Sequence, residues 1–255
     1  MSQQLNYKIQ GEGHTIVLIH GLFGNLDNLG LLARDLVLDH QVLSVDLRNH
    51  GQSFHSQTHD YASMAKDIVE LLSNLGIKTY TLVGHSMGGK VAMQVANLSR
   101  QNTSALIVLD MAPVQYHQRR HDDVFAGLFA VLDHKPASRK EAMAILEQHI
   151  DTDGVRQFLS KSLYKEGQHM TWRFNVHSLY QNYLNILAWE TQASNTVPTL
   201  FIKGANSDYL TREYQPQIQA QYPIAKAHVI ANTGHWLHAE KPAEVLRVMR
   251  RFLSK

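Results

Sequence analysis

The stretch Thr81–Met93, TLVGHSMGGKVAM, contains two different functional patterns in overlapping residues. Gly-x-Ser-x-Gly, centred on Ser86, is typical of a sharp turn that presents a nucleophilic serine between a strand and a helix. Gly-x-x-x-x-Gly-Lys, which ends at Lys90, matches most of a phosphate-binding P-loop, and a P-loop also lies between a strand and a helix. The choice between the two patterns therefore depends on what the rest of the chain supplies.

The P-loop interpretation fails at the residue that follows the lysine. A P-loop needs Ser or Thr at that position to hold magnesium, and this chain has Val91. At least three apolar runs also precede the motif, whereas a P-loop usually forms the first turn of its domain. We therefore predict that Lys90 is an ordinary residue in the first turns of a helix.

The nucleophile interpretation makes demands on the residues around Ser86 that the sequence meets. A sharp strand-to-helix turn needs small residues two positions before and after the serine, and Gly84 and Gly88 occupy these positions. The serine would then begin a helix, whose free N-terminal N–H groups favour developing negative charge. We therefore predict that Ser86 is a nucleophile.

The composition excludes several other classes of protein. The chain has 255 residues, of which 44% are hydrophobic and 18% charged. The composition predicts a folded globular protein, and the length is sufficient for one α/β domain with an insertion. A net charge of +2 with dispersed basic residues argues against a nucleic-acid partner, and Arg119-Arg120 and Arg250-Arg251 are interpreted as solvated helix faces. Without cysteine, disulfides, Cys-bound zinc and thiol catalysis are excluded. We see no secretory or membrane-spanning apolar segment, and expect a cytoplasmic location and no membrane partner.

Apolar runs that alternate with helical patterns predict an α/β fold. The runs are rich in β-branched residues and mostly lack polar alternation, as in strands buried on both faces of a parallel sheet. We therefore predict a mostly parallel central sheet flanked by helices. The expected strands are Leu5–Gln10 at an edge, Thr15–Ile19, Gln41–Val45, Tyr80–Val83, Ala105–Leu109, Thr199–Ile202 and Ala227–Ile230. The expected helices are Asn28–Leu38, Tyr61–Leu75 with Asp60 as N-cap, Met87–Leu98, Thr211–Tyr222 and Pro242–Leu253.

The alternation stops between residues 113 and 197, where no convincing strand run occurs. A helical block between two strands of a parallel sheet is inserted at the carboxyl edge of the sheet, where such sheets bind ligands. We therefore predict a core formed by residues 1–112 and 198–255, and a helical cap formed by residues 113–197. The helices expected in the cap are Asp122–Leu132, Arg139–Ile150, Gly154–Leu163 and Val176–Trp189.

A nucleophilic serine also needs backbone N–H groups that bind the oxyanion formed when it attacks a carbonyl. The loop His20–Gly24, HGLFG, follows an earlier strand run, and its glycines permit a tight turn. We predict that the N–H of Leu22 is one oxyanion donor and that the N–H of Met87, directly after the nucleophile, is the second.

The base is expected after the acid in the chain. The best candidate is His235, which lies on a glycine-containing turn after the last strand run. His238 is expected to be structural or part of a pocket wall, and the pair lacks an acidic third ligand, so we predict no metal site. His117 and His121 are interpreted as two histidines on a helix face.

Two aspartates compete for the role of the acid. Asp110 ends a buried strand run 24 residues after Ser86, where a carboxylate is costly unless it has a partner such as the histidine. Asp208 follows a later strand run, but it lies one residue beyond the position where an acid is commonly found, and Ser207 occupies that position. We favour Asp110 and keep Asp208 as the alternative.

Four motifs, HGLFG, VDLRNHGQS, GHSMGGK and GHWLHAEKP, occur in an order and spacing that resembles the α/β-hydrolase superfamily over essentially the whole chain. More narrowly, HGLFGNLDNL, VLDMAPVQYHQRRHDDVF, WRFN and TGHWLHAEKP resemble small bacterial esterases of the YbfF type. The resemblance implies the α/β-hydrolase fold, hydrolysis of carboxylic esters and no cofactor. It also implies Ser86 as nucleophile, Asp110 as acid, His235 as base, and Leu22 and Met87 as oxyanion donors.

These residues together predict a serine carboxylesterase that forms a covalent acyl-enzyme with a small-molecule carboxylic or acyl-thio ester. The same three side chains serve thioesterases, acyl-carrier methyl esterases and C–C bond hydrolases, which therefore remain alternatives, as does a non-catalytic ligand receptor. The sequence does not identify a protein partner. The aromatic residues that are candidates for the pocket lining are Phe125, Phe129, Phe158, Trp172, Phe174 and Trp189.

Overall fold

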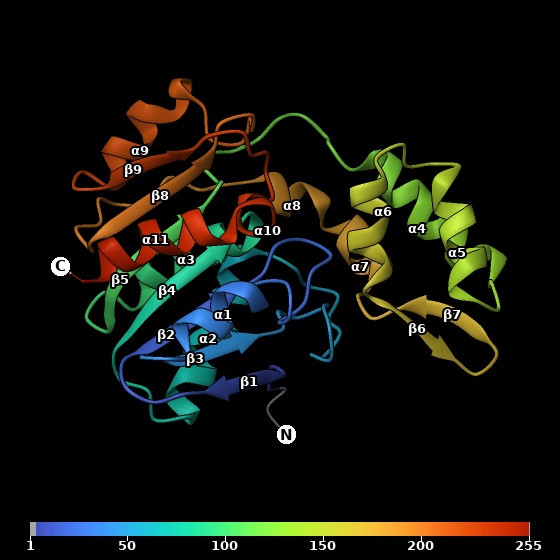
Figure 1. The fold of residues 1–255 in the computed structure, drawn as a ribbon, viewed down its shortest axis with the longest axis horizontal. Helices are drawn as coiled ribbons and strands as arrows, with labels where there is room; N and C mark the ends of the chain where they lie inside the picture. Colours follow the sequence, from blue (N-terminus) through green and yellow to red (C-terminus); the bar gives the residue numbers. More distant parts are fainter. Residues whose placement is uncertain (1–3, 255) are drawn as a thin grey trace.

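The computed structural model describes residues 4–254, which are built around a seven-stranded sheet (Figure 1). The strand order is β1-β3-β2-β4-β5-β8-β9; β1 runs antiparallel to β3 at one edge, and the other neighbours are parallel. The predicted mostly parallel sheet is therefore confirmed. The strands are β1 (Tyr7–Gln10), β2 (Thr15–Ile19), β3 (Gln41–Val45), β4 (Tyr80–His85), β5 (Thr103–Leu109), β8 (Thr199–Gly204) and β9 (Lys226–Ile230).

Helices cover both faces of the sheet, which explains why the central strands are apolar at successive positions. Along β2, Val17 and Ile19 belong to the apolar cluster that includes α2 and α3, whereas Ile16 and Leu18 belong to the cluster that includes α1 and α11. The helices of the core are α1 (Gly30–Leu36), α2 (Tyr61–Asn74), α3 (Met87–Leu98), the 3₁₀ turn η1 (Arg212–Tyr214), α9 (Gln215–Gln221), α10 (Leu237–Glu240) and α11 (Pro242–Leu253).

Two details of the core helices bear on the sequence predictions. The carboxylate of Asp60 accepts a hydrogen bond from the N–H of Ser63 at 2.7 Å, which confirms Asp60 as the N-cap of α2. The single helix expected at 211–222 is instead η1 followed by α9.

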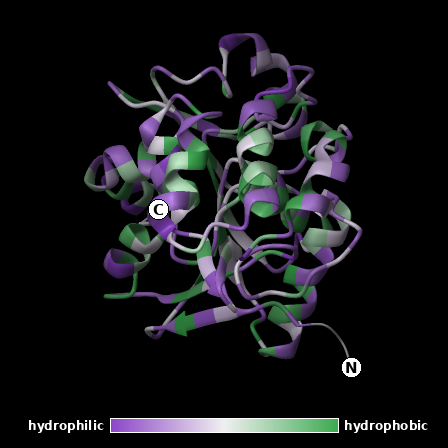
Figure 2. Ribbon diagram, turned by 90° about the vertical axis from the view of Figure 1, so that its right-hand side faces the viewer, coloured by the Kyte–Doolittle hydropathy of each residue, from purple (hydrophilic) through white to green (hydrophobic). Residues whose placement is uncertain are grey.

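Figure 2 shows helices with both hydrophobic and hydrophilic residues, as helices that pack on one side only require. Within residues 4–254, no helix is both long enough and apolar enough to cross a bilayer.

An insertion between β5 and β8 lies to one side of the sheet (Figure 1). It contains the expected helices, but the helix expected at 176–189 is divided at Asn182 into two. It also contains a hairpin, β6 paired with β7, that the sequence analysis did not predict. Each of its strands has only four residues, and the first follows a helical pattern without a break, so local periodicity did not separate them. The elements are α4 (Asp122–His134), α5 (Arg139–Glu147), α6 (Asp153–Ser160), β6 (Leu163–Glu166), β7 (His169–Trp172), α7 (Val176–Gln181) and α8 (Tyr183–Leu187).

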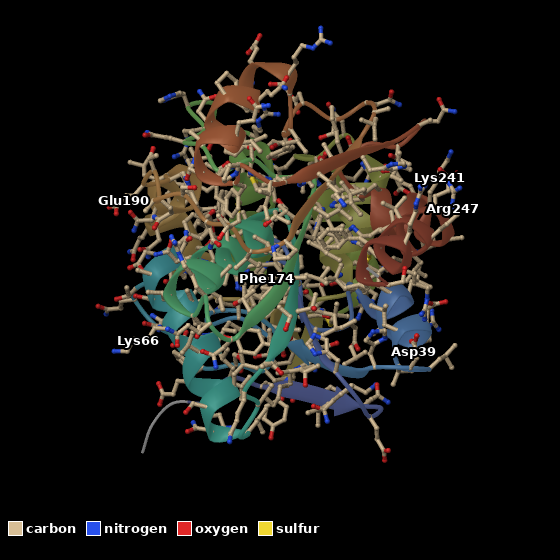
Figure 3. The ribbon with its side chains drawn as sticks, turned by 90° about the vertical axis from the view of Figure 1, so that its left-hand side faces the viewer. Asp39, Lys66, Phe174, Glu190, Lys241 and Arg247 are labelled. Carbon is tan, nitrogen blue, oxygen red and sulfur yellow. The ribbon has the colours of Figure 1, made fainter. Side chains whose placement is uncertain are left out.

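The insertion is attached to loops at the carboxyl edge of the sheet. Phe174 lies in the interior of the molecule (Figure 3), 2% exposed, and its ring packs on Phe23 with 5.3 Å between centroids. The N–H of the next residue, Asn175, donates to the carbonyl of Asn49 at 2.9 Å. These contacts hold the insertion against the loops that follow β2 and β3.

The backbones of β2, β4 and α3 approach one another too closely for side chains at Gly84 and Gly88. A Cβ on Gly88 would lie 2.3 Å from the carbonyl oxygen of Ile19, and one on Gly84 would lie 2.1 Å from that of Gly88. Because backbone atoms form both contacts, no side-chain rotation relieves them. The two glycines are therefore required by the packing of the elements that carry Ser86.

We predict that Gly88→Ala lowers the free energy of unfolding by about 3 kcal/mol or more, because the new methyl group overlaps backbone atoms. Gly30→Ala is the matched control: a Cβ there meets nothing within 4 Å, and we expect a change within about 1 kcal/mol. Urea denaturation of both variants checks this. Equal stabilities of the two variants would contradict the proposed packing.

Candidate active site

Ser86 lies where β4 ends and α3 begins, in a backbone conformation that serine rarely adopts. Its φ and ψ are 54° and −123°, and its side chain makes no capping hydrogen bond to α3 although Ser86 is the N-cap. The N–H of Ser86 donates to the carbonyl of Leu109 at 3.0 Å, which ties the turn to β5. The strained turn thus leaves the hydroxyl free of backbone partners.

The structure brings together three predicted side chains from distant parts of the chain. The hydroxyl of Ser86 lies 2.8 Å from His235 Nε2, and His235 Nδ1 lies 2.7 Å from Asp110 Oδ2. Because an ionised carboxylate only accepts hydrogen bonds, the ring proton belongs on Nδ1. His235 Nε2 is then an acceptor for the Ser86 hydroxyl, which is the arrangement that a general base requires.

Asp110 is fully buried at the end of β5, and hydrogen-bond donors surround its carboxylate. The N–H of Gly204 donates to Oδ1 at 3.0 Å, and the hydroxyl of Ser207 and the ring of His235 donate to Oδ2. Donors of this kind offset the cost of burying a carboxylate and fix its orientation. The sequence alone indicated no role for Ser207, which occupies the position where the acid is commonly found. Its contact with Asp110 depends on the parallel pairing of β5 and β8.

Asp208, the alternative acid, points elsewhere. Its carboxylate pairs with Arg120 Nη1 at 2.6 Å, and its side chain is 67% exposed. The hydrogen bond from Arg120 lowers the pKa of Asp208. The carboxylate that is hydrogen-bonded to the His235 ring is therefore that of Asp110, not that of Asp208.

The loop after β2 lies directly against Ser86, since a Cβ on Gly21 would be 3.2 Å from Ser86 Cβ. Leu22 and Met87 line one cavity together with Ser86. Among the described residues, neither of their N–H groups has a hydrogen-bond acceptor. Both N–H groups are thus available donors next to the serine.

A buried histidine holds this loop in place. Phe23 has a φ of 61°, and its N–H donates to His50 Nε2 at 3.2 Å. His50 Nδ1 in turn donates to the carbonyl of Arg48 at 3.0 Å, which fixes the neutral tautomer. Burial lowers the pKa of His50 well below its usual value, so the ring remains an acceptor at neutral pH.

Other aromatic rings surround His235. His85 Nε2 donates to the carbonyl of His235 at 2.9 Å, and the ring of His238 lies 4.2 Å from that of His85. Tyr209 stacks on the His235 ring with 3.9 Å between centroids and an interplanar angle of 21°. Burial lowers the pKa of His238 to about 3. His238 therefore acts as a neutral packing residue and lines the cavity wall.

Two cavities meet at Ser86. The smaller one has a volume of about 30 Å³, which is room for a few non-hydrogen atoms, since one water needs roughly 10–15 Å³ on the same measure. The larger one has a volume of about 700 Å³ and lies between the insertion and the sheet edge. The small cavity is lined by Leu22, Tyr61, Ser86, Met87, Met111, Tyr116, Arg120, His121, Tyr183, Ile186, Leu187 and Tyr209. His235, Trp236, His238 and Phe158 are among the residues that line only the larger one.

Arg120 and His121 are not solvated residues on a helix face, so the prediction made for them from the sequence was wrong. Both line the two cavities, and the Arg120 guanidinium lies 4.6 Å from the centre of the Tyr209 ring. His121 Nδ1 lies 2.6 Å from the hydroxyl of Tyr183, and burial lowers the pKa of His121 to about 4. They precede α4, so helical periodicity did not apply to them.

The six aromatic candidates for the pocket lining are mostly packing residues. Phe158 lines the large cavity. Phe125 and Phe129 border a groove on the outside of the insertion instead. Trp172, Phe174 and Trp189 are buried in the apolar core. Within residues 4–254, no group of three or more His, Asp or Glu side chains is arranged to hold a metal ion.

Comparison with known proteins finds relatives that match nearly the whole chain. Residues 16–248 match the profile described as alpha/beta hydrolase family. Esterase YbfF of Escherichia coli K12 is 48% identical over 96% of this chain and 95% of its own length. A putative esterase/lipase of Haemophilus influenzae is 45% identical over 98% of this chain and 88% of its own. A solved marine microorganism esterase superposes with a TM-score of 0.94 at 34% identity and covers 98% of this chain and 100% of its own.

We predict that acid destabilises the protein, because buried histidines around the site must stay neutral. Burial lowers the pKa of His59 and His238 to about 3, whereas an unfolded histidine titrates near 6.5. The unfolded chain therefore binds more protons below pH 6.5, and stability that is present above this pH is lost as the pH falls. The free energy of unfolding should be lower at pH 5 than at pH 7.5 by at least about 2 kcal/mol.

Urea denaturation at the two pH values measures this difference. His59→Leu should reduce the difference, since Nε2 of the fully buried His59 has no partner within the described chain. The exposed His228 supplies the control, and His228→Gln should leave the difference unchanged. Equal stability of the wild type at both pH values would contradict the prediction that the buried histidines stay neutral in the folded protein.

Proposed function

The chain belongs to the alpha/beta hydrolase family, and we propose that it is a serine esterase in which Ser86 is the nucleophile, His235 the base and Asp110 the acid. Two relatives named esterase or esterase/lipase support the reaction class. The observation that carries the proposal is the hydrogen-bonded path from the Ser86 hydroxyl through His235 to the buried Asp110. In the same proposal, residues 113–197 are a cap over a core formed by residues 1–112 and 198–255.

The first half of the reaction forms an acyl-enzyme. His235 Nε2 accepts the hydroxyl proton as Ser86 Oγ attacks the ester carbonyl carbon. The carbonyl oxygen becomes an oxyanion that accepts hydrogen bonds from the N–H groups of Leu22 and Met87. The carbon–oxygen bond to the alcohol then breaks, and the alcohol leaves with the proton from His235.

The second half restores the free enzyme. Water takes the place of the alcohol, gives a proton to His235 Nε2 and attacks the acyl carbon. The bond to Ser86 Oγ breaks, and Oγ recovers its proton from His235 as the carboxylic acid leaves. Throughout, Asp110 keeps the ring proton on Nδ1 and stabilises the imidazolium. Ser207 and Gly204 hold the carboxylate of Asp110 in the required orientation.

The two cavities suggest which part of the ester lies on each side of Ser86. His235 must deliver a proton to the leaving oxygen, and His235 lines only the large cavity. The alcohol, or the thiol of an acyl-thio ester, therefore departs through the large cavity of about 700 Å³. The acyl group then occupies the small cavity of about 30 Å³. We infer that the substrates are short-chain acyl esters of a bulky alcohol or thiol.

The direct test of the nucleophile is Ser86→Ala with p-nitrophenyl acetate as the substrate. We expect kcat/KM to fall by about 10⁵-fold or more, because no other group can form the acyl-enzyme. Ser73→Ala is the matched control, since Ser73 lies exposed on α2, and it should retain wild-type activity. Substantial turnover by Ser86→Ala would rule out the serine mechanism.

A second prediction compares the two aspartates. Asp110→Asn should reduce kcat by about 10³- to 10⁴-fold, because an amide at this position favours the wrong tautomer of the histidine. Asp208→Asn should reduce kcat by less than about tenfold, since an exposed ion pair contributes little. Steady-state kinetics of the two variants decide the ranking. The reverse order would transfer the role of the acid to Asp208.

A further inference from the structure

Lys90 lies in the first turn of α3, as the sequence predicted, but its burial was not predicted. The residue is fully buried, with 0% exposure, four positions after Ser86. Within residues 4–254, no carboxylate lies within ion-pair distance of its Nζ. A buried lysine without a carboxylate partner is costly and uncommon. Its burial therefore requires other partners close to the site.

Backbone carbonyls and aromatic rings supply these partners. Lys90 Nζ donates to the carbonyls of Leu187 and Ala188 at 3.1 and 2.9 Å, where α8 ends and the chain returns to the core. The C-terminus of a helix carries partial negative charge and attracts a cation. Nζ also lies 4.8 Å from the centre of the Tyr116 ring and 5.4 Å from that of Tyr61.

The groups that Lys90 holds form one wall of the small cavity. Tyr61, Tyr116 and Leu187 line this cavity together with Ser86, whereas Lys90 itself lines neither cavity. The hydroxyl of Tyr61 donates to the carbonyl of Ile186 at 2.6 Å, and the N–H of Tyr116 donates to that of Leu187 at 2.9 Å. Lys90 thus completes a set of donors that ties the end of α8 to the core behind the cavity.

We propose that Lys90 is a positioning residue that fixes this wall and thereby limits the length of the acyl chain that the enzyme accepts. The proposal rests on the proposed function, in which the acyl group occupies the small cavity. Burial lowers the pKa of Lys90 to about 7. An uncharged amine still carries two N–H bonds for the two carbonyls, so the wall is held in either protonation state.

The experiment compares the wild type with Lys90→Met, which keeps the length of the side chain and removes its donors. The substrates are the p-nitrophenyl esters of acetate, butyrate and hexanoate, measured as kcat and KM. For the wild type, kcat/KM should fall as the acyl chain lengthens. Lys90→Met should keep the kcat for acetate close to wild type and raise kcat/KM for hexanoate relative to acetate by about tenfold, mainly through KM.

Two further variants complete the design. Lys66→Met makes the same change at an exposed lysine on α2, at the periphery in Figure 3, and should leave the acyl preference unchanged. Tyr61→Phe keeps the ring and removes the donor to Ile186, so it should shift the preference in the same direction as Lys90→Met. If Lys90→Met does not fold, Tyr61→Phe still tests the proposal.

The outcomes separate this proposal from the function on which it rests. An unchanged acyl preference in Lys90→Met and Tyr61→Phe, with hydrolysis that still depends on Ser86, would overturn the role of Lys90 and leave the esterase intact. An equal loss for all three esters would also overturn it, because this is what general disruption of the fold produces. Wild-type protein without Ser86-dependent hydrolysis of any of these esters would overturn both.

Discussion

The backbone around Ser86 exists in its present form because two neighbouring positions have no side chain. Gly84 and Gly88 let β2, β4 and α3 approach to distances that a methyl group would prevent. This approach turns the chain sharply at Ser86 and places the loop after β2 directly against the serine. The candidate donors of Leu22 and Met87, the position of the hydroxyl and the two cavities that meet there all depend on the same contact.

Two of the buried histidines around the site stay neutral. His50 and His85 are buried, each donates to a backbone carbonyl, and burial lowers the pKa of both rings. The buried carboxylate of Asp110 is surrounded by donors from β8, the loop after it and His235. The oriented carboxylate of Asp110 favours one tautomer of His235, and the proposed proton transfers need that tautomer.

Much of the fold and of the candidate site follows from local sequence, because Ser86 and Asp110 directly follow strands and Leu22 and His235 lie in the loops after strands. The runs before His20, Ser86 and Asp110 are apolar at successive positions, and such runs occur where a sheet is covered on both faces. Their carboxyl ends meet at one edge, so the loops after them are expected to converge. The structure brings the predicted side chains of Ser86, Asp110 and His235 within hydrogen-bond distance.

The remaining site residues depend on contacts between segments far apart in the chain. Ser207 contacts Asp110 because β8 pairs with β5. Tyr209 contacts His235 because the loops after β8 and β9 lie side by side. Lys90 looks like a surface lysine in its own helix, and it is buried because the end of α8, about 97 residues later, covers it. Short elements such as the β6–β7 hairpin are missed because four residues carry too little periodicity.

The central claim is that Ser86 is the group that attacks the substrate. Labelling of the wild-type protein with a fluorophosphonate, followed by peptide mapping with mass spectrometry, tests it directly, because this reagent reacts with a serine that a neighbouring base activates. We expect one stoichiometric label on the peptide that contains Ser86, and no label in His235→Ala. Absence of the label from the folded wild type, or a label on another residue, would show that Ser86 is not the nucleophile.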